Sequence, residues 1–469
     1  MPSRRPVSLA IQDEPVSGDD GAPVRRIPRP DHCVSRSNIS QGALRVLYRL
    51  KEAGFQAYIV GGGVRDLLLG RAPKDFDVAT DARPEQVREL FRNCRLIGRR
   101  FRLAHVHFGD EIVEVATFRA RHDGDAIGGQ MENGRIVRDN VFGTIEDDAW
   151  RRDFTINALY YSIEDFSIVD YVGGMADLQA KELRLIGDPW LRYREDPVRM
   201  LRAVRFASKL GFRFAEDTEA PLPELAGLLR EVPPARLFDE ILKLFMAGFG
   251  RRAFHILRHF GLFAPLFPQT DRCLEQGDAF ALALVDTALA ATDARVAEGK
   301  SVTPAYLYAA MLWAPLRREV ERVKDAEGVG EYLAIQAVVK NLVGMQSEAA
   351  ALPKRFALPM QDIWAMQPRF RQRSKQRVAR LMAHPRFRAG YDFLCLRAQA
   401  GDEEADEACQ WWTERQEGVA SGEPSTAEPK RKPRRRSKRR RGKSKAETSG
   451  HAADSGGAEG ESAPGADRA

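Results

Sequence analysis

Two aspartates one residue apart, Asp75 and Asp77, lie in the apolar run Asp75-Phe76-Asp77-Val78-Ala79. If this run is a β-strand, side chains two positions apart lie on the same face, so the two carboxylates project together. Neighbouring carboxylates repel each other unless a cation relieves the repulsion. Mg²⁺ is commonly held by one or two carboxylates together with substrate phosphates. The pair therefore predicts a magnesium site, and we expect two ions there.

Three consecutive glycines lie just upstream of the aspartates. Gly61, Gly62 and Gly63 follow the β-prone run 58–60 and precede a short predicted helix at 64–69. A helix N-terminus attracts an anion through its unpaired N–H groups and its dipole. We therefore expect Gly61, Gly62 and Arg65 to contact phosphates. Each motif alone is more often a tight turn or a solvated strand face, but their combination indicates nucleotidyl transfer.

Further charged residues occur downstream. Glu114 lies on a predicted strand at 111–118, in a hairpin with 103–108. Arg151, Arg152 and Asp153 follow a polar, Gly-rich stretch at 120–140, which we interpret as a mobile loop over the site. The arginines are fixed cations suited to phosphates. Glu114 and Asp153 are alternative third carboxylates, and the residues alone do not rank them.

A predicted helix near residue 200 carries a stripe of arginines. Asp196 stands at its expected N-cap and Pro197 at its first position. Arg199, Arg202 and Arg205 recur every three residues and share one face. No acid is interleaved with them, so a polyanion opposite them is a better interpretation than a solvated stripe.

The segments quoted above resemble one family closely. Residues 61–70 and the following Asp-x-Asp strand are similar to the GGxVRDxLLG pattern of the class II nucleotidyltransferases, the group of bacterial poly(A) polymerases and tRNA CCA-adding enzymes. The strand VEVATFR, the segment RRDFTINAL and the pattern EDxxRxxR resemble other motifs of this family. The resemblance is strong over 43–214 and only general beyond.

The resemblance implies roles for individual residues. Asp75, Asp77, Glu114 and Asp153 would be catalytic, and Asp75 and Asp77 would bind the metal. Asp196 would accept a hydrogen bond from the adenine amino group, and Arg199 would donate to a ring nitrogen. The ATP site would consist of Gly61, Gly62, Arg65, Arg151, Arg152, Asp196, Arg199, Arg202 and Arg205.

The whole chain is expected to be an α+β protein. We predict a disordered extension at 1–40, a catalytic head with a small mixed sheet at 41–177, a helical neck for nucleotide recognition at 178–245, an RNA-binding helical body at 246–416, and a disordered basic tail at 417–469. There is no apolar run long enough to span a membrane and no secretory signal. The five scattered cysteines lack CxxC spacing, which indicates a reducing compartment, and we expect a cytoplasmic protein.

Most of the basic charge lies in the tail. The formal net charge is +7, but residues 430–445 contain twelve basic residues and no acid. The rest of the chain has 61 basic and 66 acidic residues. Such a run binds RNA phosphates without sequence preference. The predicted RNA contacts are Lys430, Arg434, Arg435, Arg436, Lys438, Arg439 and Arg440.

The segment at 96–105 is similar to the one that distinguishes bacterial poly(A) polymerases from CCA-adding enzymes. We therefore expect template-independent AMP addition from ATP to RNA 3′ ends, by a monomer, with RNA decay and its machinery as the family's implied context. The alternatives are a CCA-adding enzyme, a non-catalytic RNA-binding protein, and a nucleotidyltransferase acting on a protein or small molecule.

Overall fold

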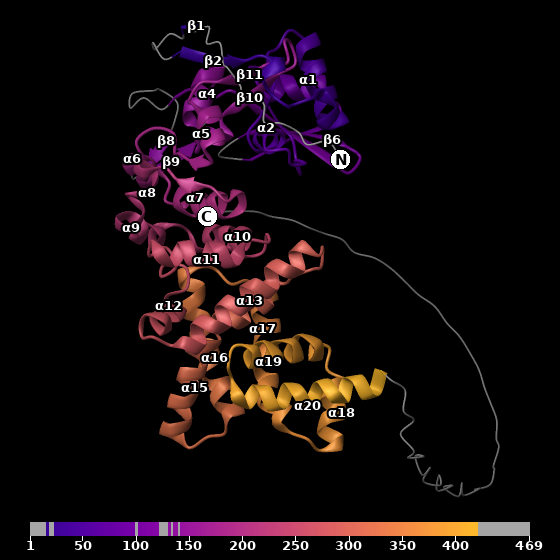
Figure 1. The fold of residues 1–469 in the computed structure, drawn as a ribbon, viewed down its shortest axis with the longest axis vertical. Coiled ribbons are helices and arrows are strands. Elements are labelled where there is room, and N and C mark those ends of the chain that lie inside the picture. Colours follow the sequence, from indigo (N-terminus) through magenta and orange to yellow (C-terminus); the bar gives the residue numbers. More distant parts are fainter. Residues whose placement is uncertain are drawn as a thin grey trace, which may run out of the picture. The chain divides into compact units, whose positions relative to one another are not determined.

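The computed structural model describes residues 16–17, 23–98, 102–121, 130–132, 135–138 and 141–420. The strands of this part belong to its indigo and magenta segments in Figure 1, while the orange and yellow segments are helical. This order confirms the predicted fold class of a mixed-sheet head followed by a helical neck and body.

The head is built on a nine-stranded sheet of order β1-β2-β11-β10-β3-β4-β7-β6-β5. β4 and β7 are parallel, and the other paired neighbours are antiparallel. The strands are β1 (Val16–Ser17), β2 (Pro23–Ile27), β3 (Ala57–Val60), β4 (Asp77–Thr80), β5 (Cys94–Ile97), β6 (Leu103–Phe108), β7 (Glu111–Thr117), β10 (Leu159–Ser162) and β11 (Ile168–Asp170). Two small sheets pair β8 (Gln130–Glu132) with β9 (Arg135–Arg138) and β12 (Glu182–Leu183) with β13 (Arg213–Phe214).

The two faces of the large sheet pack in different ways. Alternate residues of the strands, such as Ile59, Val78 and Val113, join the main core together with α1. The opposite residues of the neighbouring strands, such as Val60 and Ala79, pack in a smaller cluster with α4. Because side chains alternate along a strand, this second face also carries Asp77 and Glu114.

The helices connect the strands and then form the remainder of the described chain. They are α1 (Gln41–Glu52), α2 (Gly62–Leu68), α3 (Pro84–Leu90), α4 (Ile145–Arg151), α5 (Gly174–Ala180), α6 (Pro189–Glu195), α7 (Val198–Leu210), α8 (Glu216–Glu219), α9 (Leu222–Leu225), α10 (Pro234–Phe245), α11 (Gly250–His259), α12 (Pro268–Glu275), α13 (Ala279–Ala297), α14 (Pro304–Met311), α15 (Trp313–Glu327), α16 (Glu331–Ala349), α17 (Lys354–Met366), α18 (Lys375–Met382), α19 (Phe387–Gln399) and α20 (Glu403–Ala420).

Local interactions explain where several of these elements begin or turn. α1 begins after Ser40, whose hydroxyl accepts a hydrogen bond from the Ala43 N–H. The hairpin of β6 and β7 turns at Gly109 and Asp110 as expected. Gly61 has φ +76°, which only glycine adopts without strain, and it leads directly into α2.

Three expectations differ from the structure. The predicted disordered extension is wrong for 23–40, because β2 pairs with β11 and so gains backbone hydrogen bonds from a distant strand. The predicted strand 75–79 begins only at Asp77, so Asp75 lies just before β4. The predicted loop 120–140 contains the hairpin of β8 and β9 within its described residues.

Two further findings concern the whole described part. Cys395 and Cys409 form a disulfide between α19 and α20, a pairing that the scattered cysteines did not suggest. Within the described ranges, no helix is long and apolar enough to cross a membrane.

Candidate functional site

Asp77 and Glu114 lie directly opposite each other on the parallel strands β4 and β7. Both side chains are exposed to solvent. A Cβ atom on Gly61 would lie 3.8 Å from Asp77 Oδ2 and 3.6 Å from a terminal nitrogen of Arg152. The glycine turn, the carboxylates and Arg152 therefore occupy one site at the start of β4.

The Asp77 carboxyl has a raised pKa. The protein packed around it, together with the charges of Glu114 and Asp75, raises its pKa to about 6, although Arg152 acts in the opposite direction. A carboxylate whose ionisation is opposed by neighbouring carboxylates is stabilised by any cation that joins them. This electrostatic situation fits a divalent ion.

The donor set is compatible with magnesium. Among the described residues, no group of three His, Cys, Asp or Glu side chains is arranged to hold a metal ion. Mg²⁺ does not require such a cage, since one or two carboxylates and substrate phosphates suffice. Asp75, Asp77 and Glu114 are the residues that would hold it.

Asp153 is bound to Arg202 of α7 and to donors of its own segment. Arg202 Nε donates to Asp153 Oδ2 at 2.7 Å, and a terminal nitrogen of Arg202 contacts the same oxygen. The other oxygen accepts from the Phe154 N–H at 2.9 Å and from Asn157 at 3.3 Å. Burial alone would raise the pKa of Asp153, but Arg202 and these hydrogen bonds outweigh it and lower the pKa to about 2. Asp153 thus joins the head to α7.

Arg152 is fixed by a buried hydrogen-bond network. Its Nε donates to Asp148 Oδ2 at 3.1 Å and to the Tyr160 hydroxyl at 3.0 Å, and Tyr160 donates to the same carboxylate at 2.7 Å. Burial opposes the charge of Arg152, but Tyr160 and Asp148 outweigh it and raise its pKa. The guanidinium is therefore permanently charged beside Asp77.

Several arginines crowd together next to this network. Burial lowers the pKa of Arg151 to about 9, and the charges of Arg119, Arg192 and Arg199 contribute to the decrease. Burial and Arg199 lower the pKa of Arg192 to about 10. Glu195 is the acid that counteracts both shifts. This arginine cluster, defined as Arg119, Arg151, Arg192 and Arg199, is suited to a polyanion.

Helix α6 holds the cluster in place. A terminal nitrogen of Arg192 donates to the backbone carbonyls of Arg151 and Arg152, at 2.9 and 2.7 Å. Arg199 donates to the Arg192 carbonyl at 2.7 Å and to Glu195 Oε2 at 2.8 Å. The end of α4 is therefore tied to the junction of α6 and α7.

The arginine stripe of α7 is not free of acids, which corrects the sequence interpretation. Glu195 pairs with Arg199, and Asp153 pairs with Arg202, because the acids come from α6 and from the head. Arg205 differs, since its Nε has no hydrogen-bond partner within the described structure. Burial, followed by the charge of Arg202, lowers the pKa of Arg205.

Arg65 lies in the interior and not at the surface of the glycine turn. It is 2% exposed, and it donates to Asn157 Oδ1 at 2.6 Å and to Asp66 Oδ1 at 2.7 and 2.9 Å. The expectation that Arg65 contacts phosphate is at odds with this placement, because its hydrogen bonds already serve the packing of α2. Asp66 also accepts from Lys209 of α7.

Asp196 has both carboxylate oxygens occupied. Arg236 of α10 donates to Oδ1 at 2.8 Å and to Oδ2 at 2.7 Å, a bidentate pair. Asp196 Oδ1 also accepts from the Val198 N–H at 3.3 Å, at the start of α7. The residue expected to read the adenine amino group is therefore held by Arg236, a residue of the predicted neck that the sequence analysis did not single out.

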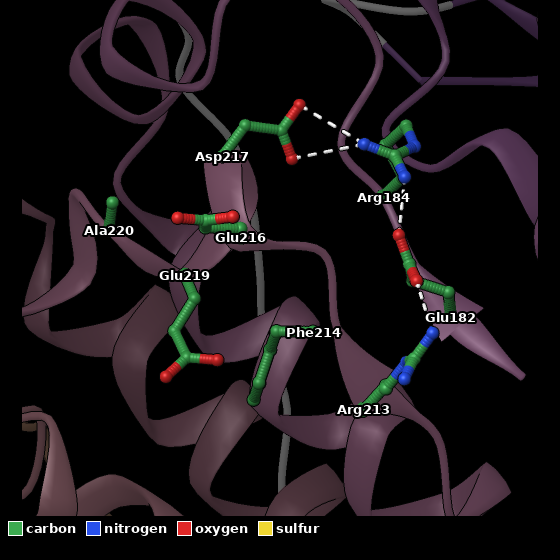
Figure 2. A pocket seen from close by; sticks show the side chains of 8 residues that line it. All are labelled: Glu182, Arg184, Arg213, Phe214, Glu216, Asp217, Glu219 and Ala220. Atoms are coloured by element: carbon green, nitrogen blue, oxygen red, sulfur yellow. Dashed lines mark hydrogen bonds and ion pairs between the residues drawn. The ribbon is translucent and has the colours of Figure 1, made fainter.

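A separate depression, of about 1000 Å³, lies among β12, β13 and α8. Figure 2 shows Arg184 bonded to Asp217 and Glu182, and Arg213 bonded to Glu182. With four acids and two arginines among its lining residues, it is unsuited to RNA phosphates, and it contains none of the residues described above.

The predicted RNA contacts of the tail lie outside the described residues. Arg119, Asp148, Asn157, Arg192 and Arg236 belong to the site but were not predicted. Arg119 is the last residue of VEVATFR, and Asn157 lies within RRDFTINAL, so their motifs carried a signal. Arg236 carried none, because its partner is 40 positions away.

Comparison with known proteins identifies the class. The structure resembles a Bacillus stearothermophilus CCA-adding enzyme solved in complex with CTP, with a TM-score of 0.54, 28% identity and coverage of 81% of this chain and 82% of that chain. A profile of the poly A polymerase head domain matches residues 57–184. The sheet, the carboxylates and the arginine cluster define this protein as a nucleotidyltransferase.

The chain belongs to the poly(A) polymerase I family. It is 52% identical over 396 residues to poly(A) polymerase I of Salmonella typhimurium, covering 83% of this chain and 85% of that protein. The corresponding protein of Haemophilus influenzae is 49% identical over 388 residues, with 82% and 86% covered. A CCA-adding enzyme of Lactobacillus helveticus is 40% identical over only 214 residues, 46% of this chain and 52% of that protein.

Two other family profiles match further segments of the chain. Residues 211–274 match the probable RNA and SrmB-binding site of polymerase A, and residues 327–446 match the polymerase A arginine-rich C-terminus. The sequence relationship to the poly(A) polymerases therefore extends beyond the head into the helical body. The sequence match to the CCA-adding enzyme of Lactobacillus helveticus covers 46% of this chain.

Proposed function

We propose that this protein adds AMP from ATP to RNA 3′ ends without a template. The single observation that carries this proposal is the adjacency of the Asp77–Glu114 carboxylate pair to a fixed arginine cluster, with Arg152 and Gly61 between them. The similarity to poly(A) polymerase I over most of the chain favours poly(A) addition over CCA addition. In this family, the addition of poly(A) to RNA generally implies promotion of RNA decay.

The metal site would consist of Asp75 and Asp77, with Glu114 as the third carboxylate. Two bound magnesium ions would supply Lewis-acid activation of the 3′-hydroxyl and neutralisation of the triphosphate. Glu114 is preferred to Asp153 because Glu114 lies opposite Asp77, whereas Asp153 is bound to Arg202. Asp153 is then a positioning residue for α7.

The triphosphate would bind the arginine cluster and the backbone of Gly61 and Gly62. The cations of Arg151 and Arg192 are disfavoured by their surroundings, so a bound polyanion relieves repulsion that the free protein carries. Arg152 remains charged beside Asp77 and orients the reacting phosphate. In the reaction, the RNA 3′-oxygen bonds to the α-phosphorus while the bond to the pyrophosphate oxygen breaks.

The base would be read by side chains of the neck. Arg199 lies at the start of α7 beside Asp196, and both are fixed by neighbouring groups. A fixed donor and acceptor set can distinguish adenine from other bases, since a mismatched base leaves buried polar groups unpaired. Arg202 and Arg205 extend the cationic face toward the phosphates. The basic tail at 430–445 would hold RNA regardless of sequence.

The test is a primer-extension assay with each of the four nucleoside triphosphates offered separately on an unstructured RNA. Long ATP-dependent extension, with little incorporation of CTP, supports the proposal. The same enzyme is then given tRNA that lacks its CCA end. Incorporation of CTP followed by ATP, stopping at three residues, would contradict it.

A variant separates catalysis from binding. Asp77→Ala should abolish AMP incorporation while RNA affinity, measured by fluorescence anisotropy, stays nearly unchanged. The matched control is Asp81→Ala, which removes an exposed carboxylate just beyond the other end of β4. Retained incorporation by Asp77→Ala would refute the assigned site.

A further inference from the structure

Within the described part of the chain, one half of the sheet face that carries Asp77 and Glu114 is open to solvent. Over β10, β3 and β4 this face is covered by α4, whose Ala149 packs with Val60, Ala79 and Tyr160. Over β7, β6 and β5 the same face carries exposed or partly exposed side chains. Asp77 and Glu114 lie at the boundary between the covered and the open half.

The register defines which residues share the open half. His105 lies opposite Glu114, His107 lies opposite Ile112, and Arg95 lies opposite His105. Ile97 lies opposite Leu103 on the same face. We call these side chains the strand platform: Arg95, Ile97, Leu103, His105, His107 and Ile112.

The platform has an unusual composition for a solvated strand face. Ile97 is 41% and Ile112 is 44% exposed, although both are large apolar residues. The rings of His105 and His107 lie 6.5 Å apart, centroid to centroid. His105 Nε2 lies 3.3 Å from Glu114 Oε1, so the platform is continuous with the carboxylates.

The arrangement of the site leaves this side for the second substrate. Gly61 at the end of β3 and Arg152 at the end of α4 lie beside Asp77, and Arg192 of α6 donates to the Arg152 carbonyl. These groups are suited to the triphosphate. Glu114 and the strand platform lie on the other side of Asp77, beyond β4. A 3′-hydroxyl that attacks the α-phosphorus in line must approach from the side opposite to the leaving pyrophosphate.

We propose that the strand platform binds the last nucleotides of the RNA 3′ end. This inference rests on the proposed function. It assigns a role to the described residues of the segment 96–105, which is similar to the segment that distinguishes bacterial poly(A) polymerases from CCA-adding enzymes. Single-stranded RNA is bound by stacking of its bases on aromatic rings, including histidine, with arginine contacting the backbone. Stacking tolerates any base, as addition to varied RNA ends requires.

Photocrosslinking tests the location. An oligoribonucleotide with 4-thiouridine at its 3′-terminal position is bound to the full-length protein, irradiated, digested and analysed by mass spectrometry. We expect crosslinked peptides from 94–98 and 103–114. Crosslinks confined to the helical body or to the tail would overturn the proposal.

Two variants test the energetics. Stacking is worth about 1–3 kcal/mol per base, so His107→Ala should raise KM for the RNA at least about fivefold at saturating ATP, with KM for ATP unchanged. His107→Phe keeps a ring and should restore most of the loss. Failure of His107→Phe to restore it, while both variants fold, would reject stacking.

A charge reversal provides a matched control on the other face of the sheet. Arg95→Glu should raise KM for RNA, whereas Arg45→Glu, the same change on the exposed side of α1, should not. Equal effects would show that only the overall charge matters. If the protein adds no AMP at all, the proposed function fails, while the crosslinking result still reports where an RNA 3′ end binds.

Discussion

Asp77 and Glu114 occupy paired positions on β4 and β7, the two neighbouring strands of the head sheet that run parallel. Parallel register places paired side chains on one face, so the two carboxylates are neighbours although 37 positions separate them in the chain. Burial, followed by the charge of Glu114, raises the pKa of Asp77, and this electrostatic situation favours a bound cation.

The titration of Asp77 should depend on Glu114. In the metal-free protein, Asp77 should titrate near pH 6, and Glu114→Gln should lower that pKa because it removes a neighbouring negative charge. Carboxyl-detected NMR measures the titration directly. Asp81→Asn is the control and should leave it unchanged; a Glu114→Gln titration identical to wild type would contradict the pairing.

The raised pKa also predicts a stability profile. The folded state binds a proton at Asp77 more tightly than the unfolded chain does, so stability falls as the pH rises from about 4 to about 6. Asp77→Asn should therefore increase the free energy of unfolding at pH 8 and so raise the melting temperature. The increase should be less than about 1 kcal/mol because the side chain is exposed. A lower melting temperature of Asp77→Asn would contradict this sign.

The Asp153–Arg202 pair should contribute measurably to stability. Removing one member of a largely desolvated pair leaves a charge unpaired, so Asp153→Asn should cost about 2 kcal/mol in the free energy of unfolding. Because the pKa of Asp153 is lowered to about 2, its contribution is present above about pH 4 and is lost as the pH falls toward 2. Urea denaturation at several pH values measures both.

The exposed pair of Arg26 and Asp165 provides the control for that measurement. Its members are 3.1 Å apart, but each side chain is about half exposed. Asp165→Asn should therefore cost less than about 1 kcal/mol. Equal losses in the two variants would mean that burial adds nothing to the Asp153–Arg202 pair.

Neutralising one member of the arginine cluster should separate stability from binding. Arg151→Gln removes a cation whose pKa is lowered to about 9 by burial and by other arginines, so the free protein should melt at a higher temperature at pH 8. ATP binding, measured by calorimetry, should weaken at least about tenfold. Arg194→Gln, an exposed arginine of α6, should change neither quantity.

The Arg236–Asp196 pair should set base selectivity. Arg236→Ala releases a carboxylate that is otherwise held by two hydrogen bonds, so the base-reading group becomes mobile. We expect the ratio of kcat/KM for ATP over that for CTP to fall at least about tenfold, with binding of pyrophosphate unchanged. Arg230→Ala removes an exposed arginine nearby in the sequence and serves as the control. An unchanged ratio would show that Arg236 only supports the fold.

The chemistry of the site could be predicted from the sequence because the residues of each motif lie within a short segment of the chain. The Asp-x-Asp spacing, the glycine turn and the arginine repeat each depend on neighbours within a few positions, where backbone geometry decides which side chains lie together. The β6–β7 hairpin was predictable for the same reason. The strand β2 was not, because it is stabilised by β11 and not by its own residues.

The amino-acid sequence by itself determined that acids, glycines and arginines of a nucleotidyltransferase are present and in which order. Only the tertiary structure decided how they are used. It buries Arg65 against Asn157, 92 positions away, binds Asp153 to Arg202 across 49 positions, and occupies Asp196 with Arg236. Partners this distant in the sequence are determined by the packing of whole helices and strands. The local spacing of residues in the sequence does not identify them.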